Sequence, residues 1–600
     1  MPTARAALAA AVVLTAATAA GAAAVTPQPP PPTPVAAEPL SMSSWIDRAV
    51  RRMPLEQKVG QLFVATVWGK SATEEHPTNL AHYGVGTPAE VVERFHVGGV
   101  IYFNNSGTDN IDSPAQLARF SNGLQRAALR SGPHLPLIVA IDQEGGNVTR
   151  VEAPATEHPS AMAIGAGRSE RDARTSAAVN GRELRAMGVN QNFAPVADVN
   201  SNPLNPVIGA RSFSSDPDLS ARLVTAQIGG FQDGKPAETV SSSAKHFPGH
   251  GDAATDSHTG LPRIDRSAEQ WRAVDLPPFR AAVAAGIDSI MTAHIQFPSL
   301  DPSGVPATLS RPILTDLLRE ELGFDGLIVT DALGMQGVRE MFDDAEIPVM
   351  ALEAGVDQLL MPADFPLAYD AVLDAVRSGR IAEARIDESV RRVLKQKWER
   401  GIIARPLVDE RALPKKVGTP QNLAAVQALT DRTTTVLRND DDVLPLAAPG
   451  DVLVVGIGDT VNQAKTPTQL ATALGGTALP TGSRPTDAVI AQAEAAAADA
   501  DTVVVLTNNL SANTQQRTLL TRLLATGKPI VAVATQVPYD AGFVDAPTWV
   551  ATYSWRGVSM NSLAKVLLGR TSPVGRLPVA VPDGADPSVE RYPFGHGLSW

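Results

Sequence analysis

The stretch "LPLIVAID" (residues 135–142) is an almost continuous apolar run that ends in an acid, Asp142. Runs of this kind are typical of strands that are buried on both faces, as in parallel sheets covered by helices. Seven more runs precede residue 400, at 60–68, 97–103, 189–198, 239–247, 286–294, 325–331 and 355–362. Helix-like segments lie between the runs, and two of them (113–129 and 310–322) begin with serine, a favoured N-cap.

Eight alternating strand and helix units predict an α/β fold, a (β/α)8 barrel, with an open doubly wound sheet as the alternative. The polar residues at the ends of the runs favour the barrel. Acids, bases and histidines follow five of the strands, namely Asp142, Asp198, Lys245 with His246, His294 and Asp331. The carboxyl ends of barrel strands meet at one rim, where the active sites of such barrels lie. We therefore predict an active site at this rim.

A second set of apolar runs follows a polar connector that contains proline. These runs lie at 434–439, 451–459, 501–509, 528–535, 548–555 and 575–582. With helical spacers between some of them, they predict a smaller α/β sandwich domain with a mostly parallel sheet. We expect a catalytic barrel over residues 41–405, a connector over 406–430 and a C-terminal α/β sandwich domain over 431–600.

The first 24 residues are typical of a secretory signal peptide, because Arg5 precedes an Ala/Val/Leu stretch that ends in small residues. Residues 25–40 are rich in proline and predict an extended linker. The sequence contains no cysteine, so it has no residue that could be acylated in a lipoprotein. We expect a secreted, extracytoplasmic protein that does not insert into the membrane after signal cleavage.

The net charge of −12 argues against nucleic acid as a partner, because phosphate binding needs clustered positive charge. The stretch "KHFPGHGDAATDSH" (245–258) could be a metal site, a plain surface loop or a catalytic loop. Its histidine spacing matches none of the usual zinc patterns, and we predict no metal and no other cofactor. Asp256 and His258 are two residues apart, and a carboxylate bonded to an imidazole suits a general acid/base. The glycines of this stretch would let such a loop move over a ligand.

This loop resembles that of family 3 glycoside hydrolases, in the β-N-acetylglucosaminidase branch. Other motifs share the resemblance, and together they extend over nearly everything after residue 45: "IDQEGGNVTRV" (141–151), "NFAPVADVNSNPLNPVIGARSF" (192–213), "MTAHIQFP" (291–298), "GFDGLIVTDALGM" (323–335), "TVLRNDDDVLPL" (435–446) and "RYPFGHGLSW" (591–600).

The resemblance implies a role for each matching residue. Asp331 matches the catalytic nucleophile, and His258 matches the acid/base, with Asp256 as its orienting partner. The residues that match the binding site of the terminal sugar are Asp142, Arg150, Arg211, Lys245 and His246. The chemistry agrees, because a retaining glycosidase needs an ionised carboxylate at the anomeric carbon and a group that gives and takes a proton. Histidine, with an ordinary pKa of about 6.5, has both protonation states accessible at neutral pH.

The resemblance implies an exported, retaining exo-β-N-acetylglucosaminidase that acts as a monomer on GlcNAc-containing glycans. Alternatives within the family are a phosphorylase that releases the sugar to phosphate and a β-glucosidase or β-xylosidase. Two alternatives of a different class are a secreted sugar-binding protein without catalysis and a metal-dependent hydrolase. Peptidoglycan fragments and chitin oligosaccharides are both candidate substrates.

Overall fold

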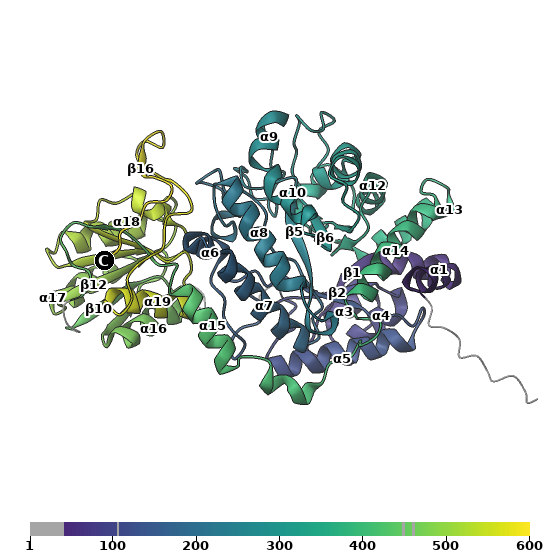
Figure 1. Cartoon of the computed structure of the whole chain (residues 1–600), viewed down its shortest axis with the longest axis horizontal. Helices are drawn as coiled ribbons and strands as arrows, with labels where there is room; N and C mark the ends of the chain where they lie inside the picture. The colour runs from purple at the N-terminus through teal and green to yellow at the C-terminus, as the bar shows by residue number, and fades with distance from the viewer. Residues whose placement is uncertain (1–40, 105–106, 447–449, 459–462) are drawn as a thin grey trace, which may run out of the picture. The chain divides into compact units, whose positions relative to one another are not determined.

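The computed structural model describes residues 41–104, 107–446, 450–458 and 463–600 of the chain (Figure 1). The contacts divide the chain after Ser41, and residues 42–600 form one compact unit. The predicted signal peptide (1–24) and linker (25–40) lie outside the described residues. In the part of the chain that the structure describes, no helix has the length and apolar character needed to cross a bilayer.

The eight apolar runs form eight parallel strands in the order β7-β6-β5-β4-β3-β2-β1-β8. The strands are β1 (Phe63–Thr66), β2 (Gly99–Tyr102), β3 (Ile138–Ile141), β4 (Gln191–Asn192), β5 (Ser241–Phe247), β6 (Ser289–Thr292), β7 (Leu327–Val329) and β8 (Leu359–Leu360). Strands β1 and β8 pair, and the parallel bridge between Val329 and Gln358 joins β7 to β8 and closes the ring. The barrel prediction is confirmed, and the alternative of an open doubly wound sheet is wrong.

The seam between β7 and β8 is closed partly by a side chain. The buried carboxylate of Asp357 accepts a hydrogen bond from the amide of Ile328 in β7 (3.1 Å). Ser389, Arg392 and Arg319 also donate to this carboxylate. Charge-assisted hydrogen bonds are stronger than neutral ones, so the start of β8 is held firmly against β7.

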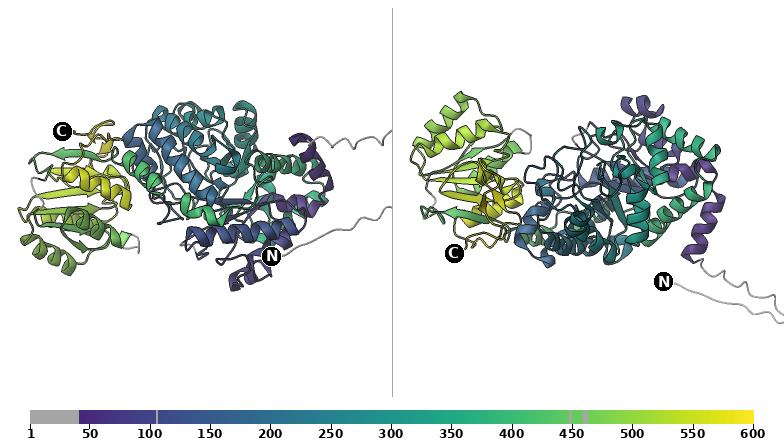
Figure 2. Two further views of the ribbon diagram at one scale, coloured as in Figure 1. Left: turned by 60° about the horizontal axis from the view of Figure 1, so that its bottom comes forward. Right: turned by 90° about the horizontal axis from the view of Figure 1, so that it is seen from above.

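Most helices of this part of the chain cover the outside of the β1–β8 ring (Figures 1 and 2). They are α1 (Met42–Arg52), α2 (Leu55–Gln61), α3 (Pro77–Tyr83), α4 (Pro88–Phe95), α5 (Pro114–Arg130), α6 (Ala161–Gly167), α7 (Glu170–Ala186), α8 (Pro217–Gln232), α9 (Ala268–Val274), α10 (Leu276–Ala284), η4 (Pro312–Glu321), α11 (Gln336–Arg339), α12 (Glu346–Ala354), α13 (Phe365–Arg377) and α14 (Glu383–Glu399). Short helical turns are η1 (Gly209–Arg211), η2 (Pro236–Glu238), η3 (Ala307–Leu309) and η5 (Glu410–Lys415). Both serines act at helix starts, since Ser113 accepts from the amide of Gln116 and Ser310 from that of Ile313.

The inside of the barrel is filled by side chains. A separate buried cluster inside the ring takes one residue from each of seven strands or their edges: Val64, Ile101, Ala140, Phe193, Met291, Val329 and Leu360. The larger core lies between the strands and the helices and includes Val139 and Ile141, the neighbours of Ala140 in β3. Side chains alternate between the two faces of a strand, which explains this division. Because the interior is packed, ligands have access only at the ends of the barrel.

The C-terminal part contains a six-stranded sheet in the order β11-β10-β12-β13-β14-β9. Its strands are β9 (Thr435–Asn439), β10 (Val452–Gly456), β11 (Thr477–Pro480), β12 (Thr502–Thr507), β13 (Ile530–Ala534) and β14 (Thr548–Ala551). Its helices and turns are α15 (Pro420–Thr430), η6 (Gln463–Lys465), α16 (Thr466–Leu474), α17 (Asp487–Ala498), α18 (Thr514–Leu524), η7 (Pro538–Gly542) and α19 (Gly557–Leu567). All strand pairs are parallel except β14 with β9. Alternate residues of β10 belong to two different buried clusters, so the sheet is covered on both faces and the sandwich prediction is confirmed.

Two strands of this part differ from the prediction. The run 575–582 does not join the main sheet but contributes only β15 (Val581–Pro582), which pairs with β16 (Glu590–Tyr592) in a separate two-stranded sheet. Pro578 and Pro582 lack the amide hydrogens that a central strand needs. Strand β11 was not predicted, because it lies at the sheet edge and its side chains are exposed or half-buried.

Candidate active site

Seven of the eight predicted site residues line a single pocket of about 420 Å³ at the carboxyl ends of the barrel strands. They are Asp142, Arg150, Arg211, Lys245, His246, His258 and Asp331. Asp142 directly follows β3, Asp331 follows β7 by two residues, and Lys245 and His246 belong to β5. Every lining residue of this pocket lies between Phe103 and Met361 and therefore comes from the barrel.

One wall of the pocket is an alternating cluster of positive and negative charges. The Nζ atom of Lys245 lies 2.7 Å from Asp142 Oδ1 and 2.7 Å from Glu144 Oε1. The guanidinium of Arg211 makes two hydrogen bonds of 2.9 Å to the carboxylate of Glu144. Glu144 was not among the predicted site residues, although it stands two residues after Asp142 in the loop that follows β3. It connects the two cations and holds both in the pocket lining.

The ionisation of Glu144 is controlled by its neighbours. Burial alone would raise the pKa of Glu144, but Arg211 and Lys245 hold it well below its ordinary value. A carboxylate with a lowered pKa stabilises the fold at neutral pH, and this contribution is lost as the pH falls below the ordinary range of glutamate. Glu144 is therefore ionised at neutral pH.

Replacement of Glu144 by glutamine is expected to lower the free energy of unfolding of the barrel by about 3–5 kcal/mol, because two buried cations lose their shared anion. Urea unfolding at neutral pH, followed by circular dichroism, measures the change. Glu75→Gln is the matched control, since Glu75 is exposed. Equal stability of the two variants would show that Glu144 does not anchor Arg211 and Lys245.

Asp331 is half-buried at the pocket, and its Oδ1 accepts a hydrogen bond from the amide of Ala332 (2.7 Å). Burial raises the pKa of Asp331, but His246 and His294 when protonated, the Ala332 amide and Lys245 together lower it below its ordinary value. This carboxylate is thus ionised at neutral pH. An ionised carboxylate in a partly enclosed pocket can act as a nucleophile.

His246 is held by a second carboxylate that lies behind it. Its Nδ1 is 2.7 Å from Asp198 Oδ2, and the amides of His246 and His250 donate to Asp198 Oδ1. Arg211 Nη2 lies 3.3 Å from His246 Nε2, so we place the His246 proton on Nδ1 and leave Nε2 as the acceptor. The sequence predicts Asp198 to be a strand-end acid and gives it no role in the site. In the structure it fixes the position and tautomer of His246.

The loop after β5 brings His258 to the pocket. His258 Nδ1 lies 2.7 Å from Asp256 Oδ1, which also accepts from the His258 amide (2.9 Å). Burial works against the charge of Asp256, but these two hydrogen bonds and the charge of His258 lower its pKa. Asp256 does not line the pocket and bonds the Nδ1 side of the imidazole, whose Nε2 has no hydrogen-bond partner among the described residues and can meet a ligand. The His258 side chain is 59% exposed, so the imidazole can exchange protons with solvent.

The base of this loop is anchored by buried contacts. The ring of His250 lies 3.0 Å from Ser257 Oγ, and burial lowers the pKa of His250 to about 4, so this histidine stays neutral. The carbonyl of Ser257 accepts from the amide of Gly337 (2.9 Å). Gly251 has a packing role beyond the predicted freedom of movement, since a Cβ there would lie 1.8 Å from the carbonyl oxygen of Val199. The histidines of the loop thus have separate partners rather than a shared centre.

Two further residues complete the surroundings. Arg150 lies with its guanidinium 4.9 Å from the centre of the Phe103 ring, and its buried Nε has no hydrogen-bond partner among the described residues. His294 does not line the pocket, because its ring is held between Thr308 and the carbonyl of Ala332. Arg150 therefore belongs to the pocket lining, whereas His294 supports the turn that carries Asp331.

A parallel barrel with a half-buried ionised aspartate and an exposed carboxylate-bound histidine at one rim pocket has the features of a carbohydrate-cleaving hydrolase. Comparison with protein families gives the class: residues 54–396 match the glycosyl hydrolase family 3 N terminal domain, and residues 434–600 match its C-terminal domain. The chain belongs to glycosyl hydrolase family 3 and is a glycoside hydrolase.

Similar proteins narrow the comparison within that family. Beta-hexosaminidase A of Pseudoalteromonas piscicida is 38% identical over 382 residues, which cover 60% of this chain and 62% of that protein. Beta-hexosaminidase LpqI of Mycobacterium tuberculosis is 35% identical over 51% of this chain and 77% of its own length. The solved structure of a family 3 beta-N-acetylglucosaminidase from Paenibacillus sp. FPU-7 superposes with a TM-score of 0.80 and 36% identity, covering 88% of this chain and 99% of that one. These relatives are of the hexosaminidase type.

Proposed function

We propose that the protein is an exported, retaining exo-β-N-acetylglucosaminidase that removes terminal β-linked GlcNAc. The proposal is carried by one observation: the half-buried Asp331 and the imidazole of His258, which Asp256 holds, line the same pocket. The volume of about 420 Å³ is in the usual range for small-molecule sites and suits one terminal sugar. The hexosaminidase-type relatives support the choice of an aminosugar.

In the first step, Asp331 attacks the anomeric carbon while His258 gives its proton to the departing glycosidic oxygen. The bond between the sugar and the leaving group breaks, and a glycosyl-enzyme ester forms on Asp331. Asp256 accepts a hydrogen bond from His258 Nδ1, which fixes the ring and stabilises the protonated form before transfer.

In the second step, the neutral His258 takes a proton from water, and the hydroxide replaces Asp331 at the anomeric carbon. The two displacements together retain the β configuration. A phosphate ion could replace the water, because a neutral imidazole repels an anion less than a second carboxylate would. Phosphorolysis is therefore the second candidate, and its product would be a sugar phosphate.

The binding residues have unused capacity for the sugar. Lys245 gives two of its three hydrogens to Asp142 and Glu144, so one remains for a sugar hydroxyl. Asp142 uses one carboxylate oxygen for Lys245 and can accept from a hydroxyl with the other. Arg150 also lines the pocket, and a guanidinium has five N–H donors. We propose that these groups, with Arg211 and His246, hold the terminal sugar.

Export, the monomeric state and the natural substrate are parts of the same proposal. The Ala-rich start of the sequence with Arg5 supports secretion, and the absence of cysteine leaves no lipid attachment site. Peptidoglycan fragments and chitin oligosaccharides both present terminal GlcNAc. Arg150 and Arg211 could meet an acidic muramyl group in the former, which gives a reason to assay both substrates.

We expect kcat/KM for 4-nitrophenyl N-acetyl-β-glucosaminide to exceed that for the β-glucoside and the β-xyloside by at least about 10²-fold, since a site that bonds the acetamido group rejects analogues that lack it. The measurement is release of 4-nitrophenol, with and without a chelator, which should have no effect. Product analysis in phosphate buffer separates free GlcNAc from its 1-phosphate. Preference for the β-glucoside would contradict the proposed substrate, and chelator-sensitive turnover would contradict the mechanism.

A further inference from the structure

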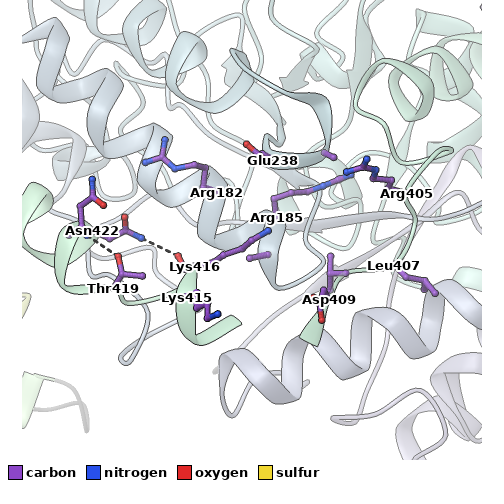
Figure 3. A pocket seen from close by; sticks show the side chains of 14 residues that line it. Arg182, Arg185, Glu238, Arg405, Leu407, Asp409, Lys415, Lys416, Thr419 and Asn422 are labelled. Atoms are coloured by element: carbon purple, nitrogen blue, oxygen red, sulfur yellow. Dashed lines mark hydrogen bonds between the residues drawn. The ribbon is translucent and has the colours of Figure 1, made fainter. Parts of the chain in front are cut away.

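A second pocket, of about 530 Å³, shares no residue with the one described above (Figure 3). It is lined by the end of α7, by η2 and by the chain between Arg405 and Asn422. Helix α7 leads into β4, and η2 leads into β5, so both elements stand at the amino ends of these strands. The second pocket is therefore at the opposite end of the barrel from Asp331.

The lining is strongly basic in a protein with a net charge of −12. Five cationic side chains, Arg182, Arg185, Arg405, Lys415 and Lys416, face two acids, Glu238 and Asp409. Figure 3 shows the arginines along one side of the pocket and the lysines on the other.

The two acids do not neutralise these cations. Asp409 accepts from the amide of Arg411, and Glu238 pairs loosely with Lys235 at 3.9 Å. Within the part of the chain that the structure describes, none of the five cations forms an ion pair shorter than 4 Å. The pocket thus has an excess of three formal positive charges that no neighbouring side chain balances directly.

Arg185 is the most informative of the five. It is only 5% exposed, and its one hydrogen bond among the described residues goes from Nη2 to the carbonyl of Arg400 (3.3 Å). Burial and the nearby charge of Arg400, which itself pairs with Asp288, lower the pKa of Arg185 to about 10. A buried guanidinium without a carboxylate is rare, because arginine has five donors and a high cost of desolvation. An anion in the pocket would satisfy it.

The start of α15 adds a further attraction for negative charge. Thr419, Gln421 and Asn422 line the pocket, and Thr419 caps the helix through the amide of Asn422 (3.2 Å). Pro420 has no amide hydrogen and Thr419 accepts from the amides of Asn422 and Leu423, so among the described residues the amide of Gln421 is the one left uncommitted in this turn, and the helix dipole adds a partial positive charge there. Anions bind at such ends when other donors converge on them.

We propose that this pocket binds a small phosphate-bearing anion with two or more negative charges. A phosphate has several acceptor oxygens and can meet donors from both sides of the pocket, whereas a carboxylate has two oxygens and one charge. A dianion or trianion also matches the excess of three positive charges. The site is separate from the active site and does not supply the acceptor of a phosphorolytic reaction, so it stands whatever the catalytic assays show.

The test is isothermal titration calorimetry of the full chain with pyrophosphate, at fixed ionic strength and with GlcNAc present to occupy the active site. We expect 1:1 binding with Kd below about 1 mM for pyrophosphate and none for acetate. Arg405→Gln/Lys415→Gln/Lys416→Gln removes three exposed charges and should weaken binding by at least about tenfold, since one lost charge-assisted bond suffices for that. Arg185→Met should weaken it likewise.

The matched control is Arg48→Gln/Arg51→Gln/Arg52→Gln, which removes the same charge from exposed positions of α1 and should bind as the wild type does. The pocket variant is also expected to keep wild-type glycosidase activity. Absence of pyrophosphate binding, equal weakening in both triple variants, binding of acetate as strong as that of pyrophosphate, or competition by GlcNAc would each overturn the proposal.

Discussion

Asparagine in place of Asp331 is expected to lower kcat by at least about 10⁴-fold, because the amide cannot form the glycosyl-enzyme. The carboxylate is ionised at neutral pH in the wild type, since the surrounding positive charges and the Ala332 amide lower its pKa. The substitution removes one charge and changes no volume, so the fold should persist. Steady-state hydrolysis of 4-nitrophenyl N-acetyl-β-glucosaminide gives the rate, and circular dichroism reports the fold.

A matched control and a chemical rescue make this prediction specific. Asp301 is a buried acid that accepts from Ser303 and Ser310 and does not line the pocket, so Asp301→Asn should keep most of the activity. Asp331→Gly opens a space below the sugar, and azide should restore turnover there and give the α-glycosyl azide. Activity of Asp331→Asn close to that of Asp301→Asn would remove Asp331 from its proposed role.

His258→Ala is expected to lower kcat/KM by about 10²–10⁴-fold for substrates whose leaving group needs a proton. For a 2,4-dinitrophenyl glycoside, the substitution should lower the rate of glycosyl-enzyme formation much less, because this leaving group departs as an anion and needs no proton. The alkaline limb of the pH profile of kcat/KM should also disappear, since that limb reports loss of the acid. Initial rates on both substrates across the pH range measure these effects.

Two control variants show whether the lower kcat/KM of His258→Ala reflects the loss of proton transfer. His82→Ala changes an exposed histidine that stacks on Trp68 away from the pocket and should have no effect on the pH profile. Asp256→Asn leaves the imidazole in place but removes the carboxylate at Nδ1, so its loss of rate should be smaller than that of His258→Ala. Equal losses for the activated and the unactivated substrate would argue that His258 positions the loop and transfers no proton.

The barrel could be predicted from the sequence because its signals are local. Each apolar run became a strand, although β4 and β8 kept only two residues of longer runs. The strand-end acid Asp142 lies at the rim because the carboxyl ends of parallel strands converge there. In contrast, the run 575–582 looks like a strand by composition, and the prolines within it limit its pairing to Val581–Pro582.

The sequence alone could not show that the carboxylates of Glu144 and Asp198 matter more to the site than other loop acids. Glu144 and Asp198 stand in loops after β3 and β4, where acids are common and most face solvent. Their importance arises from burial beside Lys245, Arg211 and His246, which are distant in the chain and brought near only by the closed sheet. The basic pocket around Arg185 was missed for the same reason, because its cations come from segments more than two hundred residues apart.

The position of Asp331 depends on a contact made in the middle of β7, the strand that precedes it. Asp357 ties the beginning of β8 to Ile328, and the aspartate proposed to attack the sugar stands three residues further along. We therefore expect a substitution of Ser389, Arg392 or Arg319, which donate to Asp357, to displace Asp331, although none of the three lines the active-site pocket. In a set of variants, such substitutions would first be detected by a lower turnover rate, although their primary effect is a weaker pairing of β7 with β8.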